Sequence, residues 1–212
     1  MINNYEFVFF DLDGVLLSST KYYAILTKRV AEELGAPVDI PYIDYHKMVG
    51  APISEALFKI VPEHNRDKIK DLFRKYNKDR VDPSYITVIE GAEELLIYLK
   101  NKSKKTAIIS TKNREALNLA LNTLNWQKYF DYSVAGCEVV NYKPDPEGLN
   151  KTLSYFGISE DKPIFIGDSV HDLNAARNAD IDFLGVLTGV NDEEDWKKEN
   201  AQYIESVKKL MI

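Results

Sequence analysis

Cysteine is almost absent from this sequence of 212 residues, which contains Cys137 alone. A single cysteine excludes an internal disulfide bond and a zinc site built from several thiolates. It is typical of proteins from the reducing interior of a cell, so we expect a cytoplasmic location. We expect Cys137 itself to be a passive small residue and not a nucleophile.

Long apolar runs are also missing. No stretch approaches the roughly 20 consecutive apolar residues that a membrane helix needs. No basic segment precedes the short apolar run at residues 7–10, so the amino terminus does not have the pattern of a signal peptide. We therefore expect no contact with a membrane.

Positive charge is in deficit, because 27 Lys and Arg residues stand against 33 Asp and Glu residues, a formal net charge of −6. A protein that binds nucleic acid needs a basic face, so we expect no nucleic-acid partner. An anionic substrate would have to be attracted locally, by a metal ion or by a few lysines.

Apolar residues make up 45% of the chain, which is enough for the core of one domain with a small insertion. Short apolar runs alternate with helical patterns from residue 85 onward, which predicts an α/β fold with a doubly wound parallel sheet. Residues 18–83 show helical periodicity only. We therefore predict an α/β core of residues 1–17 and 84–212 and an inserted small α-helical domain of residues 18–83. The predicted strands are residues 7–10, 106–109, 132–135, 163–166 and 183–186.

The first apolar run ends in two carboxylates, Asp11 and Asp13, followed by Gly14. The core of a sheet does not accept unpaired carboxylates, so we expect the strand to end at Asp11. Ligands of open α/β sheets bind at the carboxyl ends of the strands, and two carboxylates there suggest a metal ion and a phosphate. Taken alone, the pattern is equally typical of a turn.

Polar side chains follow other predicted strands as well. Ser110 and Thr111 come after the second strand, Asp168 and Asp172 after the fourth, and Lys143 lies in a loop between them. Each has a structural alternative, since Ser110 and Asp168 could cap helices and Lys143 could be a surface charge. Their occurrence in this order at the ends of alternating elements favours a shared site.

Four segments together resemble the motifs of the haloacid dehalogenase (HAD) superfamily: Asp11-Leu-Asp-Gly-Val15, Ile108-Ile-Ser-Thr111, Lys143-Pro144 and Gly167-Asp-Ser-Val-His-Asp172. The resemblance covers essentially the whole chain. It implies a Rossmann-like core, and the helical insertion is similar to the cap of the branch that includes phosphoglycolate phosphatases. One departure is Ala179-Asp180, where the family often has Ala-Gly, and this puts a local turn in doubt.

The resemblance also implies a mechanism. Asp11 would be the nucleophile that forms an aspartyl-phosphate, and Asp13 would act as general acid and then general base. Mg²⁺ is the implied cofactor, a hard ion that prefers oxygen ligands. Its implied ligands are Asp11, the backbone carbonyl of Asp13, and Asp168.

Further roles follow from the same resemblance. Lys143 would neutralise the charge of the transferred group and hold Asp11 ionised. Ser110 would donate a hydrogen bond to a phosphoryl oxygen, with Thr111 as a second candidate for such a contact. Asp172 would hold either Lys143 or the metal shell in place.

Asp13 favours phosphoryl transfer over dehalogenation, because the dehalogenases of this family lack the second carboxylate of the first motif. A sugar-phosphate mutase similar to beta-phosphoglucomutase is an alternative. However, Gly50 has apolar neighbours where such mutases have basic ones. A non-catalytic phosphate-binding regulator is a further alternative, which the presence of Asp11 and Asp13 disfavours. We expect a phosphatase that acts on a small phosphorylated metabolite, as a monomer or homodimer.

The sequence does not identify the metabolite. In this family the cap residues select the substrate, and the candidates here are Lys21, His46, Lys47 and the turn at residues 50–52. Each of them is also typical of a solvated surface. We expect His171, between two of the site carboxylates, to lie at a helix start or to serve packing.

Overall fold

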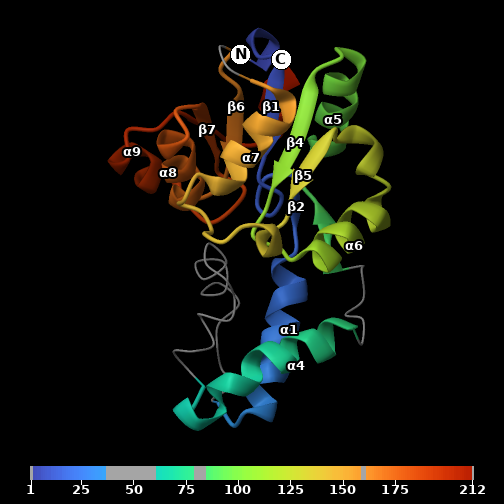
Figure 1. Ribbon diagram of the computed structural model, residues 1–212, viewed down its shortest axis with the longest axis vertical. Coiled ribbons are helices and arrows are strands. Elements are labelled where there is room, and N and C mark those ends of the chain that lie inside the picture. Colours follow the sequence, from blue (N-terminus) through green and yellow to red (C-terminus); the bar gives the residue numbers. More distant parts are fainter. Residues whose placement is uncertain (1, 37–60, 79–84, 159–160, 212) are drawn as a thin grey trace. The chain divides into compact units, whose positions relative to one another are not determined.

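The computed structural model describes residues 2–36, 61–78, 85–158 and 161–211. The chain separates into two compact units, Met1–Ser18 with Val88–Ile212 and Ser19–Thr87 (Figure 1). A helix predicted near residues 53–60 lies outside the described residues, as do the substrate-selecting candidates His46, Lys47 and the turn at 50–52.

A six-stranded parallel sheet in the order β5-β4-β1-β6-β7-β8 forms the centre of the first unit (Figure 1). The doubly wound parallel sheet predicted from the sequence is confirmed. The central strand β1 pairs with β4 and β6, and its residues Val8, Phe9 and Phe10 are fully buried, which explains its continuous apolar run. The strands are β1 (Phe7–Phe10), β4 (Lys105–Ile109), β5 (Tyr132–Val134), β6 (Ile164–Gly167), β7 (Asp182–Val186) and β8 (Tyr203–Ile204).

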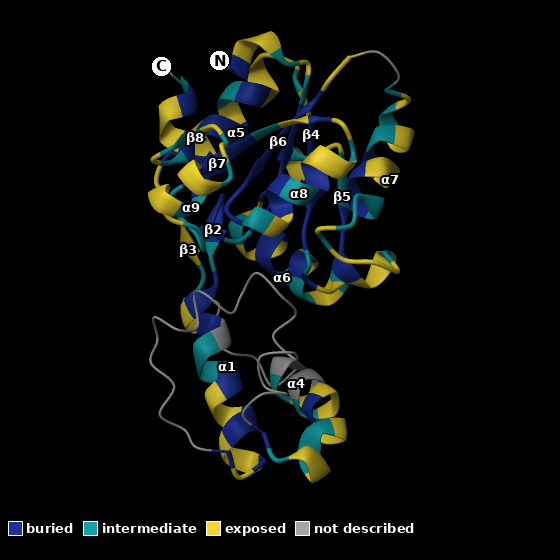
Figure 2. Cartoon of the chain, turned by 90° about the vertical axis from the view of Figure 1, so that its left-hand side faces the viewer, coloured by how far each residue is buried: buried dark blue, intermediate teal, exposed yellow. Residues whose placement is uncertain are grey.

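Helices cover this sheet and expose their outer sides to solvent (Figure 2). Leu149 of α7 and Ala175 of α8 pack in one cluster with Phe9 and Phe165 of the sheet, so these two helices share a face. None of the described helices is long and apolar enough to cross a membrane. The α-helices are α5 (Ala92–Asn101), α6 (Arg114–Leu124), α7 (Glu147–Phe156), α8 (Val170–Asn178) and α9 (Glu193–Lys198). The 3-10 helices of this unit are η1 (Ile2–Asn4), η4 (Gln127–Tyr129), η5 (Gly136–Glu138) and η6 (Val207–Met211).

Helix α9 and strand β8 do not appear among the elements predicted from the sequence. Both are short, with six and two residues, so neither carries a clear periodic pattern. Asp192 caps α9 through its side chain, and Trp196 is fully buried with its ring 5.6 Å from that of Phe183. The sheet therefore has one strand more than predicted, β8, which pairs with β7 at its edge.

The second unit consists of helices in its described part, apart from Thr87 at its end. Val30 of α1 (Thr20–Glu33) and Leu34, its C-cap residue, pack with Val61 and with Ile69 of α4 (Ile69–Lys78). Gly35 follows with φ +70, in the left-handed region that commonly ends a helix. The other element is the 3-10 helix η2 (Glu63–Lys68). A separate two-stranded sheet of β2 (Leu17–Ser18) and β3 (Thr87–Val88), which the sequence did not predict, lies where the chain passes between the units.

The turn after α8 contains the one departure from the family pattern. Asp180 has φ +53, in the left-handed region that glycine adopts freely. Aspartate enters this region more readily than most residues, so the turn forms without the glycine. The Asp180 side chain is exposed and lies 2.9 Å from Nζ of Lys162.

We expect Asp180→Ala to lower the free energy of unfolding by about 1 kcal/mol, because alanine is strained at positive φ. Asp180→Gly is the matched control, since it also loses the exposed ion pair but accepts the backbone conformation. Urea unfolding of both variants measures the difference. Equal stability of the two variants would show that this turn does not hold residue 180 in the left-handed region.

Candidate active site

Asp11 lies directly after β1, and its N–H donates a hydrogen bond of 2.9 Å to the carbonyl of Ile166 on β6. Its carboxylate is buried, and Nζ of Lys143 lies 2.7 Å from its Oδ1. The same ammonium group lies 2.5 Å from Oδ1 of Asp172 and donates to the carbonyl of Ile109 at 3.2 Å. Lys143 is therefore no surface charge, because it joins the ends of three elements.

Asp172 is fixed by the start of α8. The Oγ of Ser169, the N-cap residue, accepts a hydrogen bond from the N–H of Asp172, and Oδ2 of Asp172 accepts one from the N–H of Ser169 at 3.1 Å. This capping box leaves Oδ1 to face Lys143. Gly167 is needed here, because a Cβ at this residue would lie 2.4 Å from Cβ of Asp172. The alternative that Asp168 caps this helix is thereby excluded.

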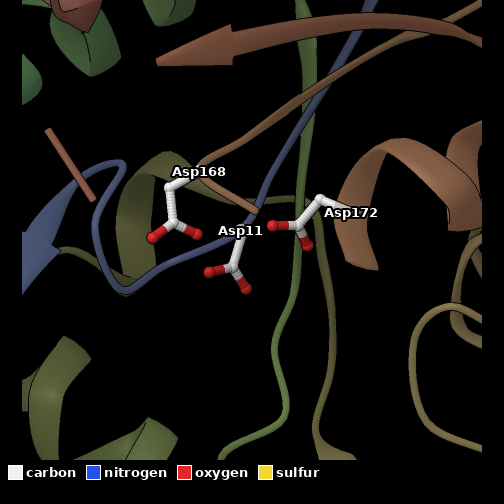
Figure 3. A group of neighbouring side chains, drawn as sticks. All are labelled: Asp11, Asp168 and Asp172. Carbon is white, nitrogen blue, oxygen red and sulfur yellow. The ribbon is translucent and has the colours of Figure 1, made fainter. Parts of the chain in front are cut away.

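Asp11, Asp168 and Asp172 bring carboxylate oxygens within 4.8 Å of one another (Figure 3). Figure 3 shows the carboxylates of Asp168 and Asp172 pointing toward that of Asp11. All three are buried, and only Lys143 among the described residues forms an ion pair with any of them. A buried all-oxygen group with excess negative charge fits a hard divalent cation such as Mg²⁺.

The electrostatics of the group point the same way. Burial raises the pKa of Asp11 to about 7, and the charges of Asp172 and Asp13 add to the rise although Lys143 opposes it. Burial and then the charges of Asp172 and Asp11 raise the pKa of Asp168 well above its usual value. Lys143 opposes this rise in the pKa of Asp11, but burial and the neighbouring carboxylates outweigh it. Three carboxylates lie beside one ammonium group, so the group carries excess negative charge.

Ser110 follows β4 and is buried, and its Oγ accepts the N–H of Lys112 at 3.2 Å. It does not cap α6, because the N-cap residue is Asn113, whose side chain accepts the N–H of Ala116. Ser110, Thr111 and Lys143 line one small pocket. These three residues therefore lie together, although the lining of this pocket does not include Asp11, Asp168 or Asp172.

Asp13 is separate from this group of three carboxylates. Its Oδ2 lies 2.7 Å from Nζ of Lys112, whose side chain is only 5% exposed. Sequence analysis missed Lys112, because a lysine in a loop is usually solvated. The available signal was its position two residues after Ser110, at the carboxyl end of a predicted strand.

Three other candidates have ordinary surroundings. His171 is exposed in the first turn of α8, as expected for a residue at a helix start. Cys137 is exposed, and its Sγ accepts the N–H of Arg114 at 3.4 Å. In the second unit, Nζ of Lys21 lies 4.8 Å from the ring centroid of Tyr85.

Residues 8–186 match the model of a protein family described as haloacid dehalogenase-like hydrolase. Among curated proteins, the chain is 34% identical over 193 residues to the phosphorylated carbohydrates phosphatase of Thermotoga maritima, covering 88% of each chain. It is 28% identical over 185 residues to the pyrophosphatase PpaX of Listeria welshimeri, covering 87% of this chain and 84% of that protein.

Solved structures agree on the fold. A candidate haloacid dehalogenase-like hydrolase from Bacteroides fragilis superposes with a TM-score of 0.88 at 23% identity, over 97% of this chain and 99% of that one. A candidate beta-phosphoglucomutase from Thermotoga maritima superposes with a TM-score of 0.74 at 27% identity, over 97% of this chain and 96% of that one. The family match, the fold and the relatives agree with the motifs, and the chain belongs to the haloacid dehalogenase-like hydrolases.

Proposed function

We propose that this protein is a Mg²⁺-dependent phosphatase that hydrolyses a small phosphate monoester through an aspartyl-phosphate on Asp11. The observation that carries the proposal is the position of the Asp11 carboxylate. It lies against the Lys143 ammonium group and within reach of Asp168 and Asp172, at the carboxyl end of the central strand. At this position the Lys143 ammonium group, and a metal ion held by the neighbouring carboxylates, would neutralise the charge of the phosphate that Asp11 attacks.

The reaction has two steps at phosphorus. A carboxylate oxygen of Asp11 forms a bond to phosphorus while the bond to the alcohol oxygen breaks, and Asp13 donates the proton that this oxygen needs. Water then attacks the phosphorus of the aspartyl-phosphate, Asp13 takes its proton, and the phosphate leaves with Asp11 restored. Lys112 holds the Asp13 carboxylate through their ion pair.

The site supplies the positive charge and hydrogen bonds for both steps. Bound Mg²⁺ would offset the repulsion between the Asp11 carboxylate and the phosphate, held by Asp11, the carbonyl of Asp13, and Asp168. Asp172 supports Lys143, since Oδ1 faces the lysine and Oδ2 accepts hydrogen bonds from Ser169. In this proposal Lys143 and Ser110 bind phosphoryl oxygens, with Thr111 as a second candidate for such a contact.

The substrate is a small phosphorylated metabolite in this proposal. The relatives support this class, because their names refer to phosphorylated carbohydrates and to pyrophosphate. A sugar-phosphate mutase is the second candidate, favoured by the structural similarity to the candidate beta-phosphoglucomutase. The region around Gly50 that would separate the two lies outside the described residues. A cytoplasmic location and a monomeric or homodimeric state stay predictions.

We expect the protein to release phosphate from p-nitrophenyl phosphate in the presence of Mg²⁺. This activity should be lost in EDTA and should return when Mg²⁺ is added back. Asp11→Asn should lower kcat by roughly 1,000-fold or more, because the nucleophile is lost. Asp161→Asn is the matched control, since Asp161 is exposed, and it should keep full activity. A panel of phosphoglycolate, sugar phosphates, nucleotides and pyrophosphate then finds the substrate.

Four results of that assay would count against the proposal. Activity that resists EDTA contradicts the metal roles, and wild-type turnover in Asp11→Asn contradicts the nucleophile. An isomerised sugar phosphate with little free phosphate favours the mutase. A folded wild-type protein that turns over no compound of the panel favours the non-catalytic regulator.

The raised pKa of Asp11 gives a stability prediction for protein kept in EDTA. The folded state binds this proton more tightly than the unfolded state, since its pKa is about 7 against an ordinary 3.8. The resulting stabilisation is complete below the ordinary pKa and is lost as the pH rises through 7. Between about pH 6 and pH 8 the wild type should lose about 1 kcal/mol of unfolding free energy.

The Asp11→Asn variant has no titrating carboxyl group at this position, so its unfolding free energy should change less over the same pH range. Urea unfolding at the two pH values, for both proteins in EDTA, measures the difference. A wild type that becomes more stable as the pH rises from 6 to 8 would contradict the raised pKa of the buried Asp11 carboxylate.

A further inference from the structure

The loop after β7, residues 187–191, lies against the metal-site carboxylate of Asp168, and none of the roles above uses it. Its last residue, Asn191, donates its N–H to the backbone carbonyl of Asp168 at 3.0 Å, and its Oδ1 accepts the N–H of Val170 at 2.8 Å. Its Nδ2 donates to Asp195 of α9 at 2.9 Å. The loop is thus bonded to the backbone of the metal-site aspartate and to that of Val170, two residues further along the chain.

The Asp168 carboxylate itself is confined by backbone. Its Oδ2 accepts the N–H of Val190 at 2.9 Å. A Cβ at Gly189 would lie 1.9 Å from this oxygen, and a Cβ at Gly14 would lie 2.2 Å from it. Neither distance leaves room for a methyl group, so the carboxylate fits only because glycine stands on both sides.

The loop also ties two strand ends together. The hydroxyl of Thr188 donates a hydrogen bond of 2.6 Å to the carbonyl of Gly14, in the turn that carries Asp13. Among the described residues, no donor bonds Oδ1 of Asp168, and Figure 3 shows this carboxylate pointing toward Asp11. One oxygen of Asp168 is therefore fixed by the loop, while the carboxylate as a whole points toward Asp11.

We infer that Thr188 and Gly189 are positioning residues for the metal, which set the Asp168 carboxylate relative to Asp11 and the Asp13 carbonyl. The inference rests on the proposed function, because it assumes that Asp168 holds the ion. Groups that orient metal ligands commonly change metal affinity when they are replaced. Gly189 leaves space for the carboxylate, and Thr188 fixes the loop against the first motif.

The test is the dissociation constant for Mg²⁺, measured by isothermal titration calorimetry without substrate and checked with Mn²⁺ by electron paramagnetic resonance. Gly189→Ala should raise it by roughly 10- to 100-fold, because the methyl group displaces the carboxylate. Thr188→Val should raise it about fivefold through loss of one hydrogen bond. Thr188→Ser, which keeps the hydroxyl, should restore most of the affinity.

Gly185→Ala is the matched control. It lies on β7, and its Cβ would meet the Trp196 ring at 2.8 Å, so it should lower stability but leave the dissociation constant within about twofold of wild type. A large loss of affinity in this control would show that general destabilisation explains the effect, and would overturn the inference.

Two other outcomes separate the inference from the proposed function. A wild type that binds neither ion overturns both. A wild type that binds Mg²⁺, with Gly189→Ala and Thr188→Val binding it equally well, overturns only the positioning role. If Gly189→Ala does not fold, the comparison of Thr188→Val with Thr188→Ser decides.

Discussion

One ammonium group among several buried carboxylates is the constraint on which the rest of the site depends. Lys143 pairs with both Asp11 and Asp172, while Asp168 lies beside them without an ion pair among the described residues. Burial makes each unpaired charge costly, and the raised pKa values of Asp11 and Asp168 express that cost. In the proposed function a divalent cation would relieve this imbalance, and a phosphate could then approach the same carboxylates.

The fold creates this crowding by bringing strand ends together. The neighbouring strands β4, β1 and β6 are followed directly by Ser110, Asp11 and Asp168, and parallel pairing places these strand ends at one edge of the sheet. The approach is close enough to require glycine at several positions. Gly14 and Gly189 make room for Asp168, and Gly167 makes room for Asp172. The close approach of the site carboxylates therefore depends on glycine in the neighbouring turns.

The central part of this arrangement could be predicted from the sequence, because buried strands have continuous apolar runs and their ends carry the polar motifs. The contacts that depend on side-chain direction could not. Only its position two residues after Ser110 separated Lys112 from a solvated lysine, yet it is buried against Asp13. The role of the loop containing Thr188 could not be predicted either, because its bond to Gly14 joins residues far apart in the sequence.

The central claim is that Asp11 accepts a phosphoryl group beside a divalent ion held by acids from separate strands. A crystal structure of the protein with Mg²⁺ and beryllium fluoride, a mimic of the phosphoryl group, tests it most directly. The account predicts the fluoride complex bonded to a carboxylate oxygen of Asp11, in contact with Lys143 and Ser110, and Mg²⁺ bound by Asp11 and Asp168. Beryllium fluoride bound elsewhere, or Mg²⁺ away from these carboxylates, would contradict it.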